Sequence, residues 1–371
     1  MELSADQIRH LRLRSQGLLR DPDTVRGSPA TVLRRALAVQ AQDAGATVLS
    51  IWARSDRLTA RDIERARVKE QSVVRTWLMR GTLHLAAAED LGWLLPVLGP
   101  RFIRTGRRRC EELGLDESVR RESLQAIEEI LSKRSPMTRT ALTERLADRG
   151  FPTEGQAAYH LLHHAGLNGL LCYGPDKEGE ETFVLLDEWA EIGAALPEDE
   201  ARAELARRYL NAYAPAGPKD LSGWSGLTLT QSRAAFRAIA DELVEIEFGG
   251  APLWLLSGQE AWLDDEPTGA SHVRLLPRYD TYLLGYRNRD LVVPDAFSKR
   301  VHPGGGILHP VVLIDGVAAA TWKMKRNRGH IEVMVDPFES FEDDVTDRLK
   351  DEVQDLGRFL EVSAHLTVLS G

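Results

Sequence analysis

The sequence has few cysteines, no long apolar run and fewer basic than acidic residues. Cys110 and Cys172 are the only cysteines among 371 residues, and their wide separation gives no zinc-type spacing. This usage fits a reducing cytoplasm and predicts no metal site. No apolar run reaches the ~18 residues of a membrane-spanning helix, and the charged, amphipathic N-terminus differs from a signal peptide. We therefore expect a cytoplasmic protein that does not contact membranes.

The net charge of −9 argues mildly against a protein that coats nucleic acid over its whole surface. Positive charge is nevertheless concentrated in two stretches. "RFIRTGRRR" (101–109) contains five arginines and no acid, and "WKMKRNRGH" (322–330) contains four cations, a histidine and no acid. These stretches leave room for a local basic track. The one glycine string, "PGGGI", lacks the strand–helix setting and the lysine of a phosphate loop, so we expect no nucleotide cofactor.

Helices followed by a two-stranded hairpin recur three times along the chain. The helices predicted before the first hairpin span 4–18, 28–41, 45–54 and 59–71. The three predicted hairpins are "SVVRTWLMRGTLHLA", "LLCYGPDKEGEETFVLL" and "LVEIEFGGAPLWLLS". Helices and then a hairpin is the order of a winged helix-turn-helix domain, and residues 214–238 show its two-helix signature most clearly.

After residue 270 the pattern changes to strands, followed by a helix at 341–361 and a terminal strand. The fold class that we predict is α+β, with three tandem winged helix-turn-helix domains and a C-terminal β-rich, barrel-like region. The predicted domains span 1–115, 116–198, 199–268 and 269–371. The stretch "LLPRYDTYLLGYRNRD" is interpreted mainly as a strand joining domains, with Asp280, Tyr282 and Tyr286 able to pair with nearby arginines.

Gln40 and Gln42 are the candidate catalytic residues. The apolar stripe of the predicted helix 28–41 continues at position 40, so Gln40 points inward, where an unpartnered amide costs roughly 1–3 kcal/mol. Asp43-Ala44-Gly45 ends that helix near residue 41, and side chains at i and i+2 share one side of an extended segment. Two converging amides can hold a water or a nucleobase edge. The alternative is that they cap free helix carbonyls. Asp43 could act as a base, although the simpler interpretation is that it caps the next helix.

The first hairpin supplies candidates for DNA contacts in Arg75, Arg80, Thr82 and His84. Arginines on a hairpin suit phosphate contacts, and His84 could form a hydrogen bond near a lesion. The alternative for His84 is a buried histidine satisfied by its neighbours. For Trp77 we favour a place in the core.

The two basic stretches supply the remaining DNA-binding candidates. Arg107 and Arg108 belong to the first stretch, which forms a helical or linker face. The second stretch forms a hairpin that carries Lys323, Lys325, Arg326 and Arg328 towards its tip. Such a hairpin can enter a DNA groove, where phosphates attract lysine and arginine. Its alternative is a solvated hairpin without a partner.

Three runs carry a family resemblance: "RTWLMRGTLHLAAAEDLGWLL", "LLPRYDTYLLGYRNRD" and "LIDGVAAATWKMKR". They resemble the winged-helix DNA glycosylase family of the azinomycin-resistance protein AlkZ, in the same order and over nearly the whole chain. Many members carry Gln-aliphatic-Asp where this chain has Gln40-Ala41-Gln42, and the Gln-x-Gln form is similar to that of AlkZ itself.

The resemblance implies a monofunctional DNA glycosylase for N7-alkylated purines in double-stranded DNA. Gln40 and Gln42 would hold the attacking water and the developing sugar cation. Bulky or interstrand-crosslinked lesions are the implied substrates, in base excision repair or in self-resistance to an antibiotic. We expect a monomer that needs no cofactor. The alternative function is a non-enzymatic winged-helix transcription regulator.

Overall fold

The computed structural model describes residues 1–19, 27–265 and 271–369. We refer to residues 1–115, 116–198 and 199–268 as the first, second and third units. The first unit begins with four helices, α1 Ala5–Ser15, α2 Pro29–Ala36, α3 Ala44–Trp52 and α4 Ala60–Val68. The predicted caps are confirmed, since the side chains of Ser28, Asp43 and Thr59 each accept a hydrogen bond from the backbone three residues on.

The prediction that the second helix extends to residue 41 is wrong. Helix α2 ends at Ala36, Leu37 adopts a φ of 63°, and Val39–Gln40 forms strand β1. This strand pairs antiparallel with β3 (Leu83–Ala87), so that Gln40 lies opposite His84. The apolar run 37–39 is fully buried, and such a run suits a buried strand as well as a helix. Its strand partner lies far along the chain, where a local pattern cannot reveal it.

The hairpins of the first and second units join in one six-stranded sheet, in the order β1-β3-β2-β5-β6-β4. Its remaining strands are β2 Val73–Trp77, β4 Met137–Thr138, β5 Leu171–Tyr173 and β6 Thr182–Leu185. The pairing of Arg75 with Tyr173 connects the two hairpins. The sequence predicts both hairpins but not their union.

Helices pack around this sheet. They are α5 Leu91–Glu112, α6 Glu117–Leu131, α7 Arg139–Asp148, α8 Ala157–Leu167 and the short α9 Leu186–Trp189. Helix α8 approaches the sheet closely at Gly166, where a Cβ atom would lie only 2.2 Å from the Trp77 ring. Trp77 is 1% exposed, which confirms its predicted place in the core.

The third unit has the predicted helix-turn-helix and its own two-stranded hairpin. Its elements are α10 Glu198–Tyr213, α11 Pro218–Ser225, α12 Leu229–Ala238, β7 Leu243–Phe248 and β8 Ala251–Leu256. Gly226, with a φ of 81°, ends α11 and makes the turn into α12. Gly249 and Gly250 both have positive φ at the hairpin tip, as the predicted turn requires.

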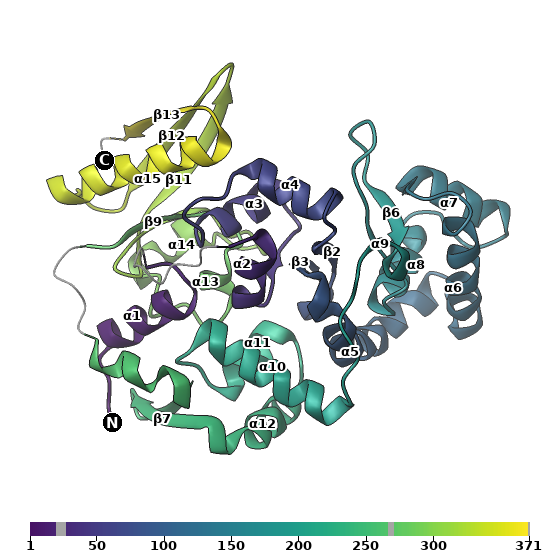
Figure 1. The fold of residues 1–371 in the computed structure, drawn as a ribbon, viewed down its shortest axis with the longest axis horizontal. Helices are drawn as coiled ribbons and strands as arrows, with labels where there is room; N and C mark the ends of the chain where they lie inside the picture. The colour runs from purple at the N-terminus through teal and green to yellow at the C-terminus, as the bar shows by residue number, and fades with distance from the viewer. Residues whose placement is uncertain (20–26, 266–270, 370–371) are drawn as a thin grey trace.

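The C-terminal region is β-rich, as predicted, and forms an open sheet in the order β13-β12-β11-β10-β9. Its elements are β9 Val273–Leu276, α13 Thr281–Leu284, α14 Ser298–Val301, β10 Val311–Ile314, β11 Val317–Asn327, β12 His330–Pro337, α15 Asp343–Leu360 and β13 Ser363–Val368. Helix α15 lies along the sheet, and the β11–β12 hairpin projects from the body of the molecule (Figure 1). The predicted joining strand ends at Leu276, because Asp280 caps α13.

Short 3-10 helices connect several of these elements, at Met79–Gly81, Ala88–Asp90, Ala240–Glu242, Ser257–Asp264 and Asp295–Phe297. In the described part of the chain, no helix is long and apolar enough to cross a membrane. The same residues contain no cluster of histidine, cysteine and carboxylate groups suited to a metal ion.

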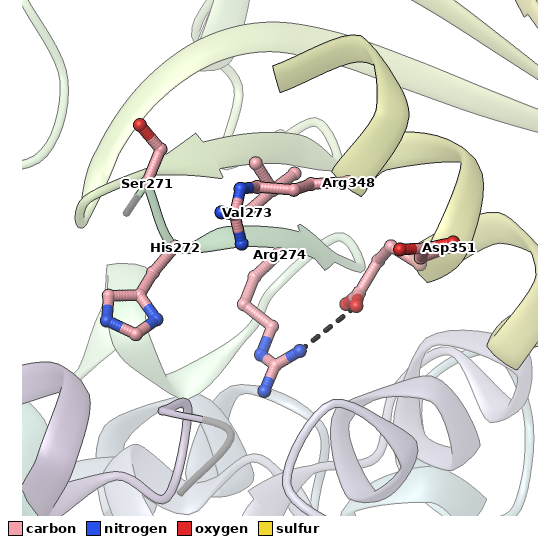
Figure 2. A pocket seen from close by; sticks show the side chains of 7 residues that line it. Ser271, His272, Val273, Arg274, Arg348 and Asp351 are labelled. Atoms are coloured by element: carbon pink, nitrogen blue, oxygen red, sulfur yellow. Dashed lines mark hydrogen bonds and ion pairs between the residues drawn. The ribbon is translucent and has the colours of Figure 1, made fainter. Parts of the chain in front are cut away.

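The C-terminal region is fastened to the first unit by buried polar contacts. The guanidinium of Arg54 donates to both carboxylate oxygens of Asp280, at 2.7 and 2.8 Å, so the partner of Asp280 is a distant arginine and not one of the nearby arginines that the sequence predicts. Within the region, Arg274 of β9 points towards α15 and pairs with Glu352 at 3.0 Å (Figure 2). The apolar clusters draw residues from both sides of the predicted domain bounds. Those bounds stay a prediction.

Candidate active site

The two candidate glutamines lie at the end of strand β1, on either side of the buried Ala41. The backbone N–H of Ala41 donates to the carbonyl of Leu83 at 2.8 Å, which continues the strand pairing past Gln40. Because the segment is extended, the side chains of Gln40 and Gln42 lie on the same side. The half-buried Gln40 donates from Nε2 to Oε1 of the exposed Gln42. The predicted convergence is therefore confirmed, and within the described residues neither amide caps a helix carbonyl.

Asp43 lies next to this pair and begins helix α3. Its Oδ1 accepts a hydrogen bond from the backbone of Ala46 at 3.0 Å, and its Oδ2 lies 3.4 Å from the guanidinium of Arg278. The hydroxyl of Thr47, one turn into α3, lies within hydrogen-bond distance of the carbonyls of Gln40 and Asp43. The predicted cap is confirmed, the Thr47 hydroxyl joins β1 to α3, and a role of Asp43 as a base stays a prediction.

His84 lies behind Gln40 on the neighbouring strand. It is 2% exposed, and burial together with the nearby positive charge of Arg80 lowers its pKa to about 3. Its Nδ1 lies 2.9 Å from the carbonyl of Thr82. A neutral imidazole adds no charge to the site at physiological pH.

Arg80, in the turn of the first hairpin, points inward. One guanidinium nitrogen, Nη1, donates to the carbonyl of Trp224, and Nη2 lies 3.5 Å from Oε1 of Gln40. Burial lowers the pKa of Arg80, and repulsion from Arg289 acts in the same direction. Within the described residues, Arg80 is the cation that approaches the amide pair, through Gln40.

The other candidates of the first hairpin also have protein partners. Arg75 donates to the carbonyl of Ala41 at 3.0 Å, pairs with Glu181 at 2.8 Å and lies over the ring of Tyr173. The hydroxyl of Thr82 donates to the carbonyl of Met79 at 3.1 Å. These contacts assign each side chain a structural role, and additional contacts with DNA stay a prediction.

The candidate DNA-binding cations of the two basic stretches lie in solvent. Arg107 and Arg108 on α5 are 63% and 92% exposed in their side chains, and each pairs with a glutamate one turn further on. Lys323, Lys325, Arg326 and Arg328 lie on the β11–β12 hairpin with their side chains exposed, and no ion pair within the described residues involves them. In the same part of the chain, no hydrogen bond or ion pair joins either stretch to the glutamines.

Local sequence patterns do not reveal the residues that reach the site from distant elements. Arg278 comes from the loop after β9, the Trp224 carbonyl comes from α11, and Arg289 follows α13. Each lies far from Gln40 along the chain, and no local motif predicts that it lies near the glutamines. The run "LLPRYDTYLLGYRNRD", which carries part of the family resemblance, contains two of them.

Comparison with known proteins agrees with this architecture. A family model described as DNA glycosylase AlkZ-like matches residues 33–359. The curated Interstrand DNA cross-link repair glycosylase of Streptomyces sahachiroi is 28% identical over 353 residues, covering 91% of each chain. The solved structure of Streptomyces sahachiroi DNA glycosylase AlkZ superimposes with a TM-score of 0.85 at 24% identity, covering 100% of each chain. This structural likeness confirms the predicted α+β fold class, and the division into three tandem winged helix-turn-helix domains stays a prediction.

Proposed function

Because the chain belongs to the AlkZ-like DNA glycosylase family, we propose that it hydrolyses the N-glycosidic bond of N7-alkylated purines in double-stranded DNA. The observation that carries the proposal is the contact between the side-chain amides of Gln40 and Gln42 at the end of β1. The cross-link repair activity in the name of the Streptomyces relative supports bulky and crosslinked lesions as substrates, with a role in repair or self-resistance. A transcription regulator is not favoured, since the family and this relative are glycosylases.

The chemistry suits an uncharged amide pair. Alkylation at N7 gives the purine a positive charge, so the base departs as a neutral molecule and needs no general acid. The protein must then hold a water and stabilise an oxocarbenium-like sugar. The amide oxygens of Gln40 and Gln42, which each have two lone pairs and accept one hydrogen bond within the protein, can do both, more weakly than a carboxylate. His84 stays neutral nearby, with a pKa of about 3, so it is not available as an acid at physiological pH.

Base loss without strand cleavage is the second part of the proposal. A lyase needs an amine that forms a Schiff base with the sugar. In the described part of the chain no hydrogen bond connects a lysine with Gln40 or Gln42. We propose hydrolysis by water as the only step. We propose that the basic hairpin with Arg107 and Arg108 contacts the phosphates, and that the protein acts as a monomer.

The test is incubation with duplexes that each contain one defined lesion. We expect abasic sites from N7-methylguanine, revealed by cleavage in alkali, and intact strands without alkali. Uracil, hypoxanthine and 8-oxoguanine are poorer leaving groups, and we expect little release of them. Efficient release of uracil would rule out a mechanism that depends on a cationic leaving group. Absence of abasic sites together with sequence-selective binding would favour a regulator.

Replacement of Gln42 with aspartate also tests this mechanism, because it places a carboxylate where the chain has an amide and restores the Gln-x-Asp pattern of many relatives. We expect Gln42→Asp to keep activity on N7-methylguanine and to change the tolerance of bulky adducts. A variant that is inactive on N7-methylguanine but retains the wild-type melting temperature would contradict the assumption that both patterns serve one mechanism.

A further inference from the structure

Arg80 is a half-buried cation that has no carboxylate partner among the described residues. The atoms that accept from its guanidinium are the carbonyl oxygen of Trp224 and, at 3.5 Å, Oε1 of Gln40. Its backbone φ of 56° is a conformation that non-glycine residues rarely adopt. A partly buried charge without a carboxylate partner and an unfavourable backbone both cost free energy, and such features concentrate at functional sites.

The Arg80 guanidinium determines the direction of the hydrogen bond between the two amides. Two neighbouring amides can hydrogen-bond in either direction, because each carries a donor at one end and an acceptor at the other. Arginine has donors only, so the end of Gln40 that faces Arg80 must be its oxygen. The nitrogen of Gln40 is then directed at Gln42, and it donates to Oε1 of Gln42. The chain of bonds therefore has one direction, and the Nε2 of Gln42 is left pointing away from Gln40.

The other guanidinium nitrogen of Arg80, Nη1, contacts the helix-turn-helix of the third unit. Trp224 lies in the last turn of α11, two residues before the turn glycine, Gly226. A Cβ atom at Gly226 would lie 3.2 Å from the Cα of Arg80 and 2.9 Å from the Phe102 ring, so the turn packs directly on the first hairpin. Arg101 of α5 donates to the carbonyl of Gly226, but within the described residues it forms no hydrogen bond with either glutamine. In that part of the chain, only Arg80 connects this turn to the amide pair through hydrogen bonds.

We propose that Arg80 is a positioning residue, which fixes the direction of the Gln40–Gln42 amide pair and connects it to the helix-turn-helix turn of the third unit. Arg80 does not touch the reacting atoms; it acts through Gln40. The inference rests on the proposed function for its effect on excision. The orientation of the amides is independent of that function and can be measured separately.

A double-mutant cycle in single-turnover excision of N7-methylguanine tests the proposal. Arg80→Lys keeps a positive charge but loses the planar fork whose two separate nitrogens face the two partners, and we expect it to lower the rate about 10-fold at unchanged DNA affinity. In a Gln40→Ala background the same change should lower the rate less than about 2-fold, because the amide that it orients is gone. Additive losses would overturn the role of Arg80 while leaving the proposed function intact.

Arg101→Lys is the matched control, since Arg101 holds the same turn without a bond to the amides. We expect its effect, whatever its size, to be the same in the wild-type and Gln40→Ala backgrounds. Coupling of Arg101 to Gln40 as strong as that of Arg80 would show that holding the turn is sufficient, and would overturn the orientation argument.

The orientation can be read without any enzyme activity, by NMR of full-length protein labelled with 15N-glutamine. The side-chain signals of Gln40 and Gln42 are assigned by their loss in the two alanine variants. We expect Arg80→Lys to shift both signals and Arg101→Lys to leave them in place. Unshifted signals in a folded Arg80→Lys protein would overturn the proposal. Wild-type excision by Gln40→Ala would instead overturn the catalytic role of the amide pair. Absence of excision by the wild-type protein would overturn the proposed function, with the NMR result still deciding the role of Arg80.

Discussion

Two hairpins of this protein carry cations in similar strand–turn–strand sequences, but the surroundings of those cations are opposite. In the first hairpin, β2–β3, Arg75 and Arg80 turn inward to carbonyls, a carboxylate and an amide. In the β11–β12 hairpin, all four candidate cations lie at the surface. Cations that already have protein partners organise a site, whereas cations in water remain available for phosphates. We therefore expect the first hairpin to affect chemistry and stability, and the second to affect DNA affinity.

The largest effect is expected from neutralising the β11–β12 hairpin. Replacing Lys323, Lys325, Arg326 and Arg328 with glutamine should weaken binding to all duplex sequences. The dependence of log affinity on log salt should flatten by about 0.9 for each phosphate interaction that the variant no longer makes. If all four cations bind phosphates, the loss of affinity between 50 and 200 mM salt should be smaller in the variant than in the wild type, by a factor on the order of 100. Titration of a fluorescent duplex over this range measures it, with Lys350→Gln on α15 as a control. An unchanged salt slope would show that the cations of the β11–β12 hairpin do not bind phosphates, and the proposed difference between the two hairpins would be wrong.

The candidate catalytic pair should show the reverse behaviour. Gln40→Ala and Gln42→Ala should each lower single-turnover excision on the order of 10-fold or more, with affinity and salt slope near those of the wild type. The exposed Gln125 of α6 provides a control, since its replacement with alanine should leave the rate unchanged. Excision at the wild-type rate by the double alanine variant would contradict the catalytic assignment. A melted double variant would indicate a structural role instead.

His84 should make the first hairpin sensitive to acid. Its pKa of about 3 in the folded protein lies below the ordinary value of 6.5. Between these pH values the unfolded chain binds a proton that the folded protein does not, so stability falls as the pH is lowered. For this one group the slope is at most about 1.4 kcal/mol per pH unit.

Urea unfolding of wild type and His84→Asn at pH 7 and pH 5 measures this effect. The stability of the variant should fall less over that interval, since asparagine does not titrate. His365→Asn on strand β13 is the control, because His365 is exposed, and it should behave as the wild type. Equal pH dependence in wild type and His84→Asn would show that His84 is not held neutral by burial.

The smallest effect is expected from Arg75. Arg75→Met removes the donor to the carbonyl of Ala41 and the ion pair with Glu181. We expect a loss of about 1–2 kcal/mol in the free energy of unfolding and no change in the salt slope of DNA binding. A flatter salt slope at wild-type stability would place Arg75 on DNA and make the two hairpins alike.

Local sequence patterns determined the helices, caps and turns of this protein. The helix caps at Ser28, Asp43 and Thr59, the hairpin turn at Gly249-Gly250 and the helix-turn-helix at Gly226 all follow from residues within a few positions of each other. The convergence of the two glutamines also belongs here, because it needs only an extended segment around Ala41. These features depend on short-range geometry, which a sequence displays directly.

Interactions between distant segments decided the rest. The strand that holds Gln40 exists because β3 pairs with it, and the first two hairpins form one sheet because Arg75 lies opposite Tyr173. Arginine is a residue type that often contacts DNA, yet Arg80 points inward. It donates a hydrogen bond to the carbonyl of Trp224, which lies 144 residues further along the chain. A side chain is directed by whichever partner satisfies it, and a partner from another part of the chain leaves no trace in the local pattern. The sequence alone therefore determined which residues could form a site, and the tertiary structure decided which of them meet.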